Sequence, residues 1–338
     1  MATIKDVAKL SGVSVSTVSI ILNGQAKARK ISEKTQKKVL EAIKELNYNP
    51  SVSARRLRSS DKEKYTVGVY WAIDFTTGFL ARFIEGLQTE LVKSKLPVST
   101  VICPFENNRL ENESGLKNMS TYNAVIIANT NIKDQEFLNE NPLPIPAVLI
   151  NRNSEKYHTI RIDNVKAGEI AANHIFRKGI TDVGMVIQKN SFYGMQERGK
   201  SFYNFFQRKG FKIPDELIVS VKNSVLGGTE AGEYFFRKGR IPRAVFVDSD
   251  VMAQGLIHFF NKNGVNVPED CEVISVGIGP SEISKYFMPS ITVVDMPLEK
   301  MASECIKLIS EILEHNIDEK KHILLDTELV IRESSPLL

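Results

Sequence analysis

A short uncharged stretch places three side chains where they could contact the edges of another molecule. In SGVSVSTVSIILNG, residues 11–24, Ser16 and Ser19 each carry a hydroxyl that can donate and accept a hydrogen bond, and Ile20 carries methyl groups. Their spacing puts all three on one face of a helix. Because no Lys or Arg occurs in this stretch, tight binding to a charged partner must come from other residues.

The surrounding pattern predicts two short helices joined by a turn and braced by a third helix. Gly12 permits the turn, and Ser14 and Ser32 are suitable N-caps for the second and third helices. The third helix is expected to end near Asn47. The apolar side chains expected to pack between the helices are Ile4, Val7, Ala8, Val18, Ile21, Leu22, Val39, Leu40, Ile43 and Leu46. This is a helix-turn-helix, which reads the major groove of DNA; a small helical bundle without a nucleic-acid role is the alternative.

Charge divides the chain into a basic head and a slightly acidic body. Residues 1–64 hold 14 Lys and Arg against 6 Asp and Glu, a net charge of +8, whereas the remaining residues hold 30 against 34, a net charge of −4. Only the head is therefore expected to meet a polyanion. The loop with Lys27, Arg29 and Lys30 is expected to contact phosphates, which supply most of the affinity for DNA.

Composition is typical of a cytoplasmic protein of several domains. The 338 residues exceed one compact core, and 42% hydrophobic with 25% charged residues is ordinary for a globular protein. Cys103, Cys271 and Cys305 lack metal-ligand spacing and are typical of reduced thiols. Lys5 and Asp6 argue against a signal peptide, and no apolar run approaches the ~20 residues that span a membrane.

No sequence motif for catalysis or cofactor binding is present. The nucleophile elbow, the P-loop, the zinc-protease helix and the dinucleotide-binding glycine fingerprint are all missing from the sequence. We therefore expect a protein that is not an enzyme, with no metal, no organic cofactor and no membrane partner.

The body alternates short β-branched runs with helical patterns. Candidate strands lie at residues 66–70, 98–103, 124–129, 147–151, 183–187, 244–249, 273–278 and 291–295, and helical patterns at 81–94, 165–178, 198–209 and 251–263. Alternating strands and helices predict parallel sheets covered by helices on both faces, and the length of the body favours two lobes. Ligands of such folds bind beyond the carboxyl ends of the strands, hence between the lobes.

The ordered set of motifs closely resembles the lactose/galactose-repressor family of bacterial transcription regulators. TIKDVAKLSGVSVSTVSIILNG and TQKKVLEAIKELNYNPSVSARRLR resemble the family's head. IDNVKAGEIAANHIFRKG, AVFVDSDVMAQGLIHFFNKNGVNVPEDCEVISVG and PSITVVDMP resemble its effector-binding core. The resemblance implies an all-α helix-turn-helix head on an α/β two-lobed core like that of periplasmic sugar-binding proteins, with the chain crossing between the lobes three times.

The resemblance also divides the chain and assigns its DNA contacts. It implies a DNA-binding domain at residues 1–48, a hinge at 49–64 and a core at 65–338. The hinge would order on DNA, pair with its dimer mate and place Leu57 in the minor groove; an ordinary basic linker is the alternative. The candidate DNA contacts are Ser14, Val15, Ser16, Thr17, Ser19, Ile20, Asn23, Lys27, Ser32, Ala54, Arg55 and Leu57.

The candidate effector contacts follow strands or begin helices. By the resemblance, Phe79 is an aromatic contact and Arg198 reaches ligand hydroxyls or carboxylates. The alternatives are that Phe79 is a core residue, that Arg198 is a surface residue and that Asp250 only caps a helix. The candidate effector contacts are Asp74, Phe79, Asn151, Arg152, Arg198, Ser249, Asp250 and Asp295.

Two residues depart from the family's pattern. Gly279 stands where the family usually has an acidic residue that holds the ligand, so that contact is missing. Ile20 stands in the expected reading helix where the family most often has Arg, which indicates a different operator.

The sequence thus predicts a homodimeric repressor that binds operator DNA under the control of a small metabolite. A sugar or sugar phosphate is the expected effector, and a purine is the second choice. A regulator controlled by a phosphorylated partner protein is an alternative, which predicts a partner surface on the lobe that faces the head. A solute-binding protein of a transporter is disfavoured by the basic helix-turn-helix.

Overall fold

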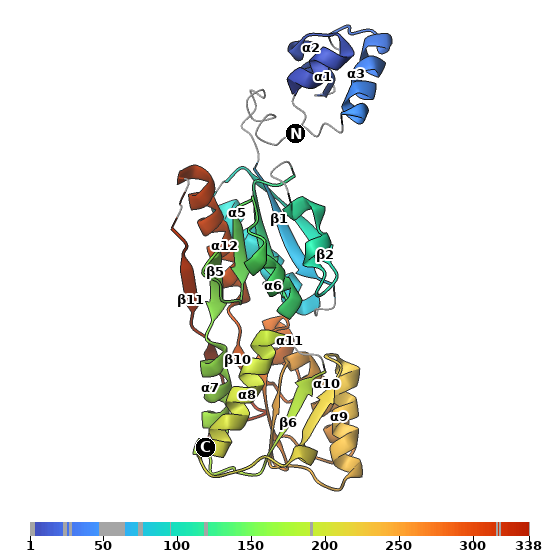
Figure 1. The fold of residues 1–338 in the computed structure, drawn as a ribbon. Helices are drawn as coiled ribbons and strands as arrows, with labels where there is room; N and C mark the ends of the chain where they lie inside the picture. The colour runs from blue at the N-terminus through green and yellow to red at the C-terminus, as the bar shows by residue number, and fades with distance from the viewer. Residues whose placement is uncertain are drawn as a thin grey trace.

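The computed structural model describes residues 4–22, 26, 29–46, 65–73, 77–94, 96–117, 121–189, 192–315, 317 and 319–337. They form a helical head and an α/β body of two lobes, as Figure 1 shows. The fold class expected from the sequence is confirmed.

The head consists of α1 (Ile4–Ser11), α2 (Val15–Leu22) and α3 (Glu33–Glu45). Val7, Val18 and Val39 are fully buried between the three helices, because apolar residues at helical spacing give each helix one apolar face. Leu40 was expected in this cluster, and that prediction is wrong, since its side chain is 57% exposed. Val39 and Ala42 fill the interface instead, and Leu40 lies about 100° around α3 from Val39.

The N-terminal lobe is a parallel sheet in the order β11-β5-β4-β3-β1-β2. Its strands are β1 (Tyr65–Ala72), β2 (Val98–Phe105), β3 (Ala124–Ala128), β4 (Ala147–Ile150), β5 (His158–Ile162) and β11 (His322–Leu325). Helices α5 (Thr77–Ser94) and α12 (Leu298–His315) pack together on one face, and α6 (Ile132–Glu140) lies on the other with two short 3-10 turns, η1 (Leu110–Asn112) and η2 (Ser114–Leu116).

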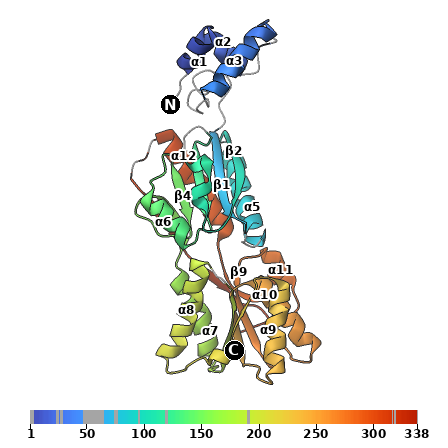
Figure 2. The same ribbon diagram turned by 45° about the vertical axis from the view of Figure 1, so that its right-hand side comes forward.

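The C-terminal lobe repeats this plan in the order β12-β10-β9-β8-β6-β7, with β12 antiparallel to β10. Its strands are β6 (Val183–Gln188), β7 (Ile218–Val221), β8 (Ala244–Val247), β9 (Glu272–Gly277), β10 (Thr292–Asp295) and β12 (Glu328–Val330). Its helices are α7 (Asn164–Arg177), α8 (Tyr193–Arg208), α9 (Val225–Arg237), α10 (Asp250–Lys262) and α11 (Ser281–Tyr286), with a 3-10 turn, η3 (Asp215–Leu217). Figure 2 shows the pair α7 and α8 on one side of the sheet and the pair α9 and α10 on the other.

The chain passes between the lobes three times, as the resemblance implied. The passages run from β5 to α7, from β10 to α12 and from β11 to β12. Each lobe is therefore assembled from separate segments of the chain. Among the described residues, no helix is both long enough and apolar enough to cross a membrane.

Candidate functional site

Serine side chains cap α2 and α3, two of the three helices of the head, as the sequence predicts. Ser14 Oγ accepts a hydrogen bond from the Thr17 amide at 3.1 Å, and Ser32 Oγ accepts one from the Thr35 amide at 3.2 Å. Each cap satisfies one backbone N–H that the helix itself leaves unpaired. The start of α2 is therefore fixed relative to the turn that precedes it.

The face of α2 that does not pack on the other helices of the head carries the side chains expected to contact bases. Val15 and Ser16 are exposed, Ser19 and Ile20 are half-buried, and Val18 is fully buried. Ile20 is not among the described side chains that pack on the apolar cluster of the head. Its methyl groups are therefore accessible on the same side of the helix as the serine hydroxyls.

Part of the expected DNA surface lies outside the described residues. Asn23, Lys27, Ala54, Arg55 and Leu57 belong to this group. These contacts, and the three domain boundaries, stay predictions.

Arg198 and Asp248 lie near the carboxyl ends of the strands of the C-terminal lobe, and each has a buried polar atom without a partner. Arg198, on α8, is 3% exposed and donates from Nη1 to Asn164 Oδ1 at 2.8 Å, whereas its Nε has no partner among the described residues. Asp248, directly after β8, is 1% exposed and accepts the Gln188 amide on Oδ2 at 2.9 Å. Its Oδ1 is likewise without a partner among the described residues.

Burial shifts the ionisation of both groups. It lowers the pKa of Arg198 to about 10, an effect that the Asp248 carboxylate opposes. It raises the pKa of Asp248 to about 6, against the Gln188 N–H and the Arg198 charge, both of which lower it. Since a buried unpaired polar group is costly, the two free atoms mark a place where a polar ligand would be stabilised.

Asn151 and Arg152 follow β4 in the N-terminal lobe and face the region between the two lobes, which we call the junction. Arg152 is 5% exposed and donates from Nε to the Thr130 carbonyl at 2.8 Å and from Nη1 to the Asn151 carbonyl at 2.7 Å. Burial lowers its pKa to about 10, and the charge of Arg198 lowers it further. Asn151, at φ +52°, accepts Asn164 Nδ2 on Oδ1 at 3.2 Å. These side chains line a cavity of about 120 Å³ between the lobes.

Ser249 and Asp250 have structural partners. Ser249 caps α10, accepting the Met252 amide at 3.3 Å and donating to Asn223 Oδ1 at 2.6 Å. Ser249, and not Asp250, is therefore the N-cap of α10. The alternative that Asp250 only caps the helix is wrong. The Asp250 carboxylate instead accepts the Gly279 amide at 3.0 Å and the Ser284 hydroxyl at 2.9 Å, and so fixes the loop after β9.

Two of the remaining candidate contacts, Phe79 and Asp295, are among the described residues. Phe79 is 3% exposed and packs on Trp71, with ring centroids 5.2 Å apart. It therefore occupies a core position, which was the alternative to a ligand contact. Asp74 lies outside the described residues. Asp295 ends β10 and pairs with Arg82 Nη1 at 3.3 Å. The role of these residues in effector binding stays a prediction.

Arg82 joins the two lobes. This α5 side chain, 4% exposed, binds Glu299 of its own lobe through Nε and Nη2, at 2.6 and 2.8 Å. Its Nη1 reaches across to the carbonyls of Gly277 and Gly279, at 3.1 and 3.4 Å, and to Asp295. One guanidinium therefore connects α5 and α12 with the carboxyl ends of β9 and β10.

The close packing around position 279 explains why this residue is a glycine. A Cβ built on Gly279 would lie 3.2 Å from an oxygen of the Asp250 carboxylate, and a Cβ built on Gly78 would lie 3.3 Å from Gly279 Cα. An acidic side chain at position 279 would therefore bring a second carboxylate against Asp250. The small residues instead let the start of α5 approach the loop after β9 closely.

Three residues of this junction were not found from the sequence. Asp248 directly precedes Ser249 in VDSD and lies at the same strand end, so its position was the available signal. Arg82 shares the helical spacing of Phe79 and Phe83, and a charge on an apolar face indicates a buried partner. Asn129, which follows β3 at φ +59°, is 6% exposed, and its Nδ2 has no partner among the described residues.

Two family models match the head and the body separately, and known proteins match almost the whole chain. The model of "Bacterial regulatory proteins, lacI family" matches residues 3–51, and that of a "Periplasmic binding protein-like domain" matches residues 172–335. The HTH-type transcriptional repressor PurR of Photobacterium profundum is 29% identical over 99% of this chain and 98% of its own length. The HTH-type transcriptional regulator MalR of Clostridium butyricum is 30% identical over 98% of each chain. The chain belongs to the lacI family.

The lacI-family assignment extends to the three-dimensional structure. A crystal structure of a LacI family transcription regulator from Clostridium acetobutylicum is 33% identical, with a TM-score of 0.77 over 80% of this chain and 100% of that chain. In this lacI-family regulator, the helix-turn-helix is the DNA-binding domain and the two-lobed body is the effector-binding domain. Its named relatives are DNA-binding transcription regulators and not enzymes.

Proposed function

We propose that this regulator is a homodimeric repressor whose affinity for its operator is set by a small metabolite bound between the lobes. The observation that carries the proposal is two buried atoms, Arg198 Nε and Asp248 Oδ1, that have no partner among the described residues. A hydrogen-bonding ligand would satisfy both and recover the free energy that their isolation costs. Because the chain passes between the lobes three times, a ligand held there acts on both lobes at once.

A carbohydrate or a sugar phosphate is the effector class that this chemistry favours. Each sugar hydroxyl donates and accepts, so neighbouring hydroxyls can serve a guanidinium and a carboxylate together. Arg152 and Arg198 supply two buried guanidinium groups at the junction, which suit the anionic group of a sugar phosphate, whereas the Asp248 carboxylate suits its hydroxyls. A purine, which carries ring nitrogens in place of hydroxyls, is the alternative ligand.

The family and the surface of the molecule support the proposed dimer. The lac repressor structure that shares this fold, at 18% identity and a TM-score of 0.70, is a dimer bound to operator. Here Val101 and Ile102 on the edge strand β2 are 42% and 38% exposed, and Tyr286 and Met288 at the end of α11 are 73% and 84% exposed. Figure 2 shows β2 and α11 on the same side of the body. A second copy covering this side would bury apolar surface in both lobes.

A thermal-shift screen of sugars, sugar phosphates and nucleobases tests the effector class. A ligand at 100 times its Kd should stabilise the folded protein by about 2.7 kcal/mol. A compound that raises the melting temperature should also change operator affinity in a DNA mobility-shift assay. If only nucleobases stabilise the protein, the sugar assignment is wrong. If none of the three classes does so while a phosphorylated protein alters DNA binding, control by a partner protein replaces it.

A further inference from the structure

The N-terminal sheet has an uncovered region at β5 and β11, far from the dimer side proposed above. β4 and β5 are parallel neighbours, yet residues 151–157 join them without a helix. Ile160 and Ile162 of β5 lie in the core that α12 covers, so Thr159 and Arg161 belong to the opposite face. On that face α6 covers β3 and β4, and a pocket opens beside β5, where Thr159 is buried and Arg161 is half-buried.

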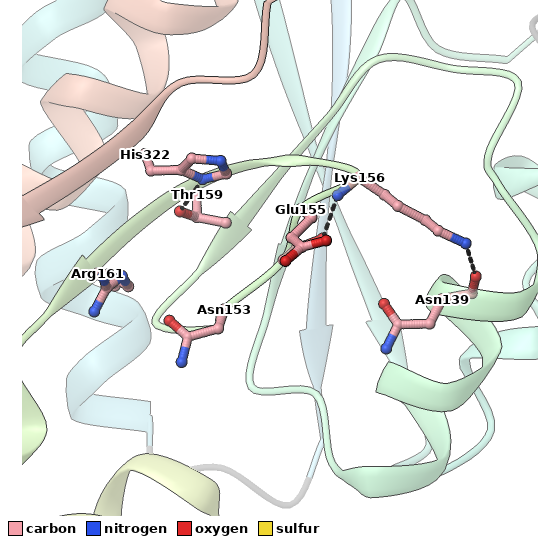
Figure 3. A pocket seen from close by; sticks show the side chains of 8 residues that line it. Asn139, Asn153, Glu155, Lys156, Thr159, Arg161 and His322 are labelled. Atoms are coloured by element: carbon pink, nitrogen blue, oxygen red, sulfur yellow. Dashed lines mark hydrogen bonds between the residues drawn. The ribbon is translucent and has the colours of Figure 1, made fainter.

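This opening forms a pocket of about 580 Å³, which we call the strand-edge pocket. Figure 3 shows its lining, with Arg161, Asn153, Thr159 and His322 grouped around the two strands and Lys156 extending toward Asn139 at the end of α6. The volume lies within the range of pockets that hold metabolites of the size of a nucleotide.

The strand-edge pocket is rich in positive charge and in hydrogen-bond donors. Lys156 and Arg161 supply cations against the single carboxylate of Glu155. Arg161 makes no ion pair with any described residue, and Lys156 Nζ is bound only to the neutral Asn139 carbonyl. His322 is oriented by a 3.0 Å hydrogen bond between its Nδ1 and Thr159 Oγ1, which leaves its Nε2 available.

Further cationic side chains lie near the core histidine of β5, on the other face of the strand. His158 lies on the inner face of β5 and is 3% exposed. Burial lowers its pKa to about 4, and the charges of Lys320, His322 and Lys321 lower it further. Lys320 and Lys321 thus add positive charge near β5 beyond the side chains that line the pocket.

The strand-edge pocket adjoins the junction between the lobes. Asn153 and Arg161 also line the 120 Å³ cavity that contains Arg152 and Tyr193. β5 itself runs directly into α7, the first passage between the lobes. A ligand in the pocket would therefore contact the strand that leads into the other lobe.

We infer that the strand-edge pocket is a second small-molecule site, which takes a phosphorylated metabolite and is separate from the inter-lobe effector site. Phosphate oxygens accept hydrogen bonds only, so they suit the donors of Arg161, His322 and Asn153. Bidentate binding by the unpaired Arg161 is the main contact, and Lys156 adds charge. Occupation of this site biases the junction through β5 and so modulates the response to the inter-lobe effector.

Calorimetry with ribose 5-phosphate, ribose and inorganic phosphate tests the inference on the full chain. Ribose 5-phosphate should bind with saturation, inorganic phosphate more weakly, and ribose not at all. Arg161→Gln and His322→Gln should each weaken ribose 5-phosphate binding at least tenfold. Arg208→Gln is the matched control, because this exposed arginine pairs with Glu169 on the surface of the other lobe, and it should bind as the wild type does.

A second set of variants separates the two sites. In Arg198→Ala, ribose 5-phosphate should still bind with wild-type affinity, and adding His322→Gln, which lines the strand-edge pocket but not the inter-lobe cavity, should weaken that binding at least tenfold. Loss of binding in Arg198→Ala with full binding in His322→Gln would place the ligand between the lobes and overturn the inference. Equal binding by the wild type and Arg161→Gln, or no saturable binding by the wild type, would overturn it as well.

Discussion

Arg82 and Glu299 form a two-pronged ion pair within the N-terminal lobe, with N–O distances of 2.6 and 2.8 Å. The pair orients the guanidinium so that its third nitrogen meets the carbonyls of Gly277 and Gly279 in the other lobe. A contact within one lobe thus prepares a contact between lobes. The Arg82 network holds the start of α5 against the ends of β9 and β10, on the side of the junction where the family's usual acidic residue is missing.

Arg82→Met should destabilise the protein and loosen the junction. The change removes charged hydrogen bonds, but Glu299 and Asp295 are 40% and 31% exposed and would be partly rehydrated. We therefore expect a loss of about 1–3 kcal/mol in the free energy of unfolding by urea. Small-angle scattering should show a larger radius of gyration. Lys93→Met, at an exposed position of the same helix, is the control, and equal stability of the two variants would contradict a joining role for Arg82.

Asp248→Asn should stabilise the protein at neutral pH and lose this advantage in acid. The pKa of Asp248 is raised from 3.8 to about 6, so the folded state holds the proton more tightly than the unfolded chain. The contribution of this group is complete below pH 3.8 and is lost as the pH rises through about 6. Above that pH the variant should be about 3 kcal/mol more stable than the wild type, since one pKa unit is worth about 1.4 kcal/mol.

Urea unfolding from pH 4 to pH 8 measures this difference. The gap between variant and wild type should open between pH 4 and pH 6 and then stay constant. Asp215→Asn, an exposed aspartate of η3, should show no such gap. A constant gap across the whole range would mean that Asp248 does not change its protonation in this window.

Arg198→Ala should weaken effector binding and spare operator binding. The expected loss is about 1.5–3 kcal/mol, the value of a hydrogen bond to a charged group. Titration calorimetry with the compound found in the thermal-shift screen measures it, and a mobility-shift assay without that compound measures DNA affinity. Arg208→Ala serves as the surface control. Unchanged effector affinity in Arg198→Ala would remove this residue from the site.

Ile20→Arg should change the operator preference at one base pair. The accessible methyl groups of Ile20 can pack on a thymine methyl, so we expect an A·T pair at that position. Arginine should shift the preference to G·C by about 1–3 kcal/mol, the value of a bidentate contact with guanine. Selection from a randomised operator library measures this for both proteins. A G·C preference of the wild-type protein at this position would show that Ile20 does not contact the base.

Sequence patterns predicted the helices and strands whose own residues show a clear hydrophobic pattern. All eight β-branched runs became strands. Seven of them are central strands, which are buried on both faces, and the eighth, β2, is an edge strand. The strands β5, β7, β11 and β12 were missed, and three of them lie at sheet edges where polar residues are tolerated. HTIRI, the sequence of β5, has His158 and Arg161 among its five residues and resembles a loop.

The junction was harder to predict because its contacts join residues far apart in the chain. Arg82 and Glu299 are 217 positions apart, and nothing local in either sequence indicates the other. The caps of Ser14 and Ser32 were predictable, since each bonds to an amide three residues away. Whether Phe79 lay in the core or faced a ligand could not be decided by spacing, because both positions belong to the same apolar stripe.

The three passages between the lobes determine the order in which the two lobes can fold during synthesis. The N-terminal lobe needs α12 to cover its sheet and β11 to complete it, and both leave the ribosome after residue 297. β6 to β10 of the C-terminal lobe emerge earlier, in one continuous segment at 183–295. The second lobe in the sequence should therefore become compact first, while residues 65–162 form a sheet whose apolar face is covered only in part, by α5. A ribosome that stalls within the C-terminal lobe would release a chain prone to aggregate, and chaperone binding should peak during that interval.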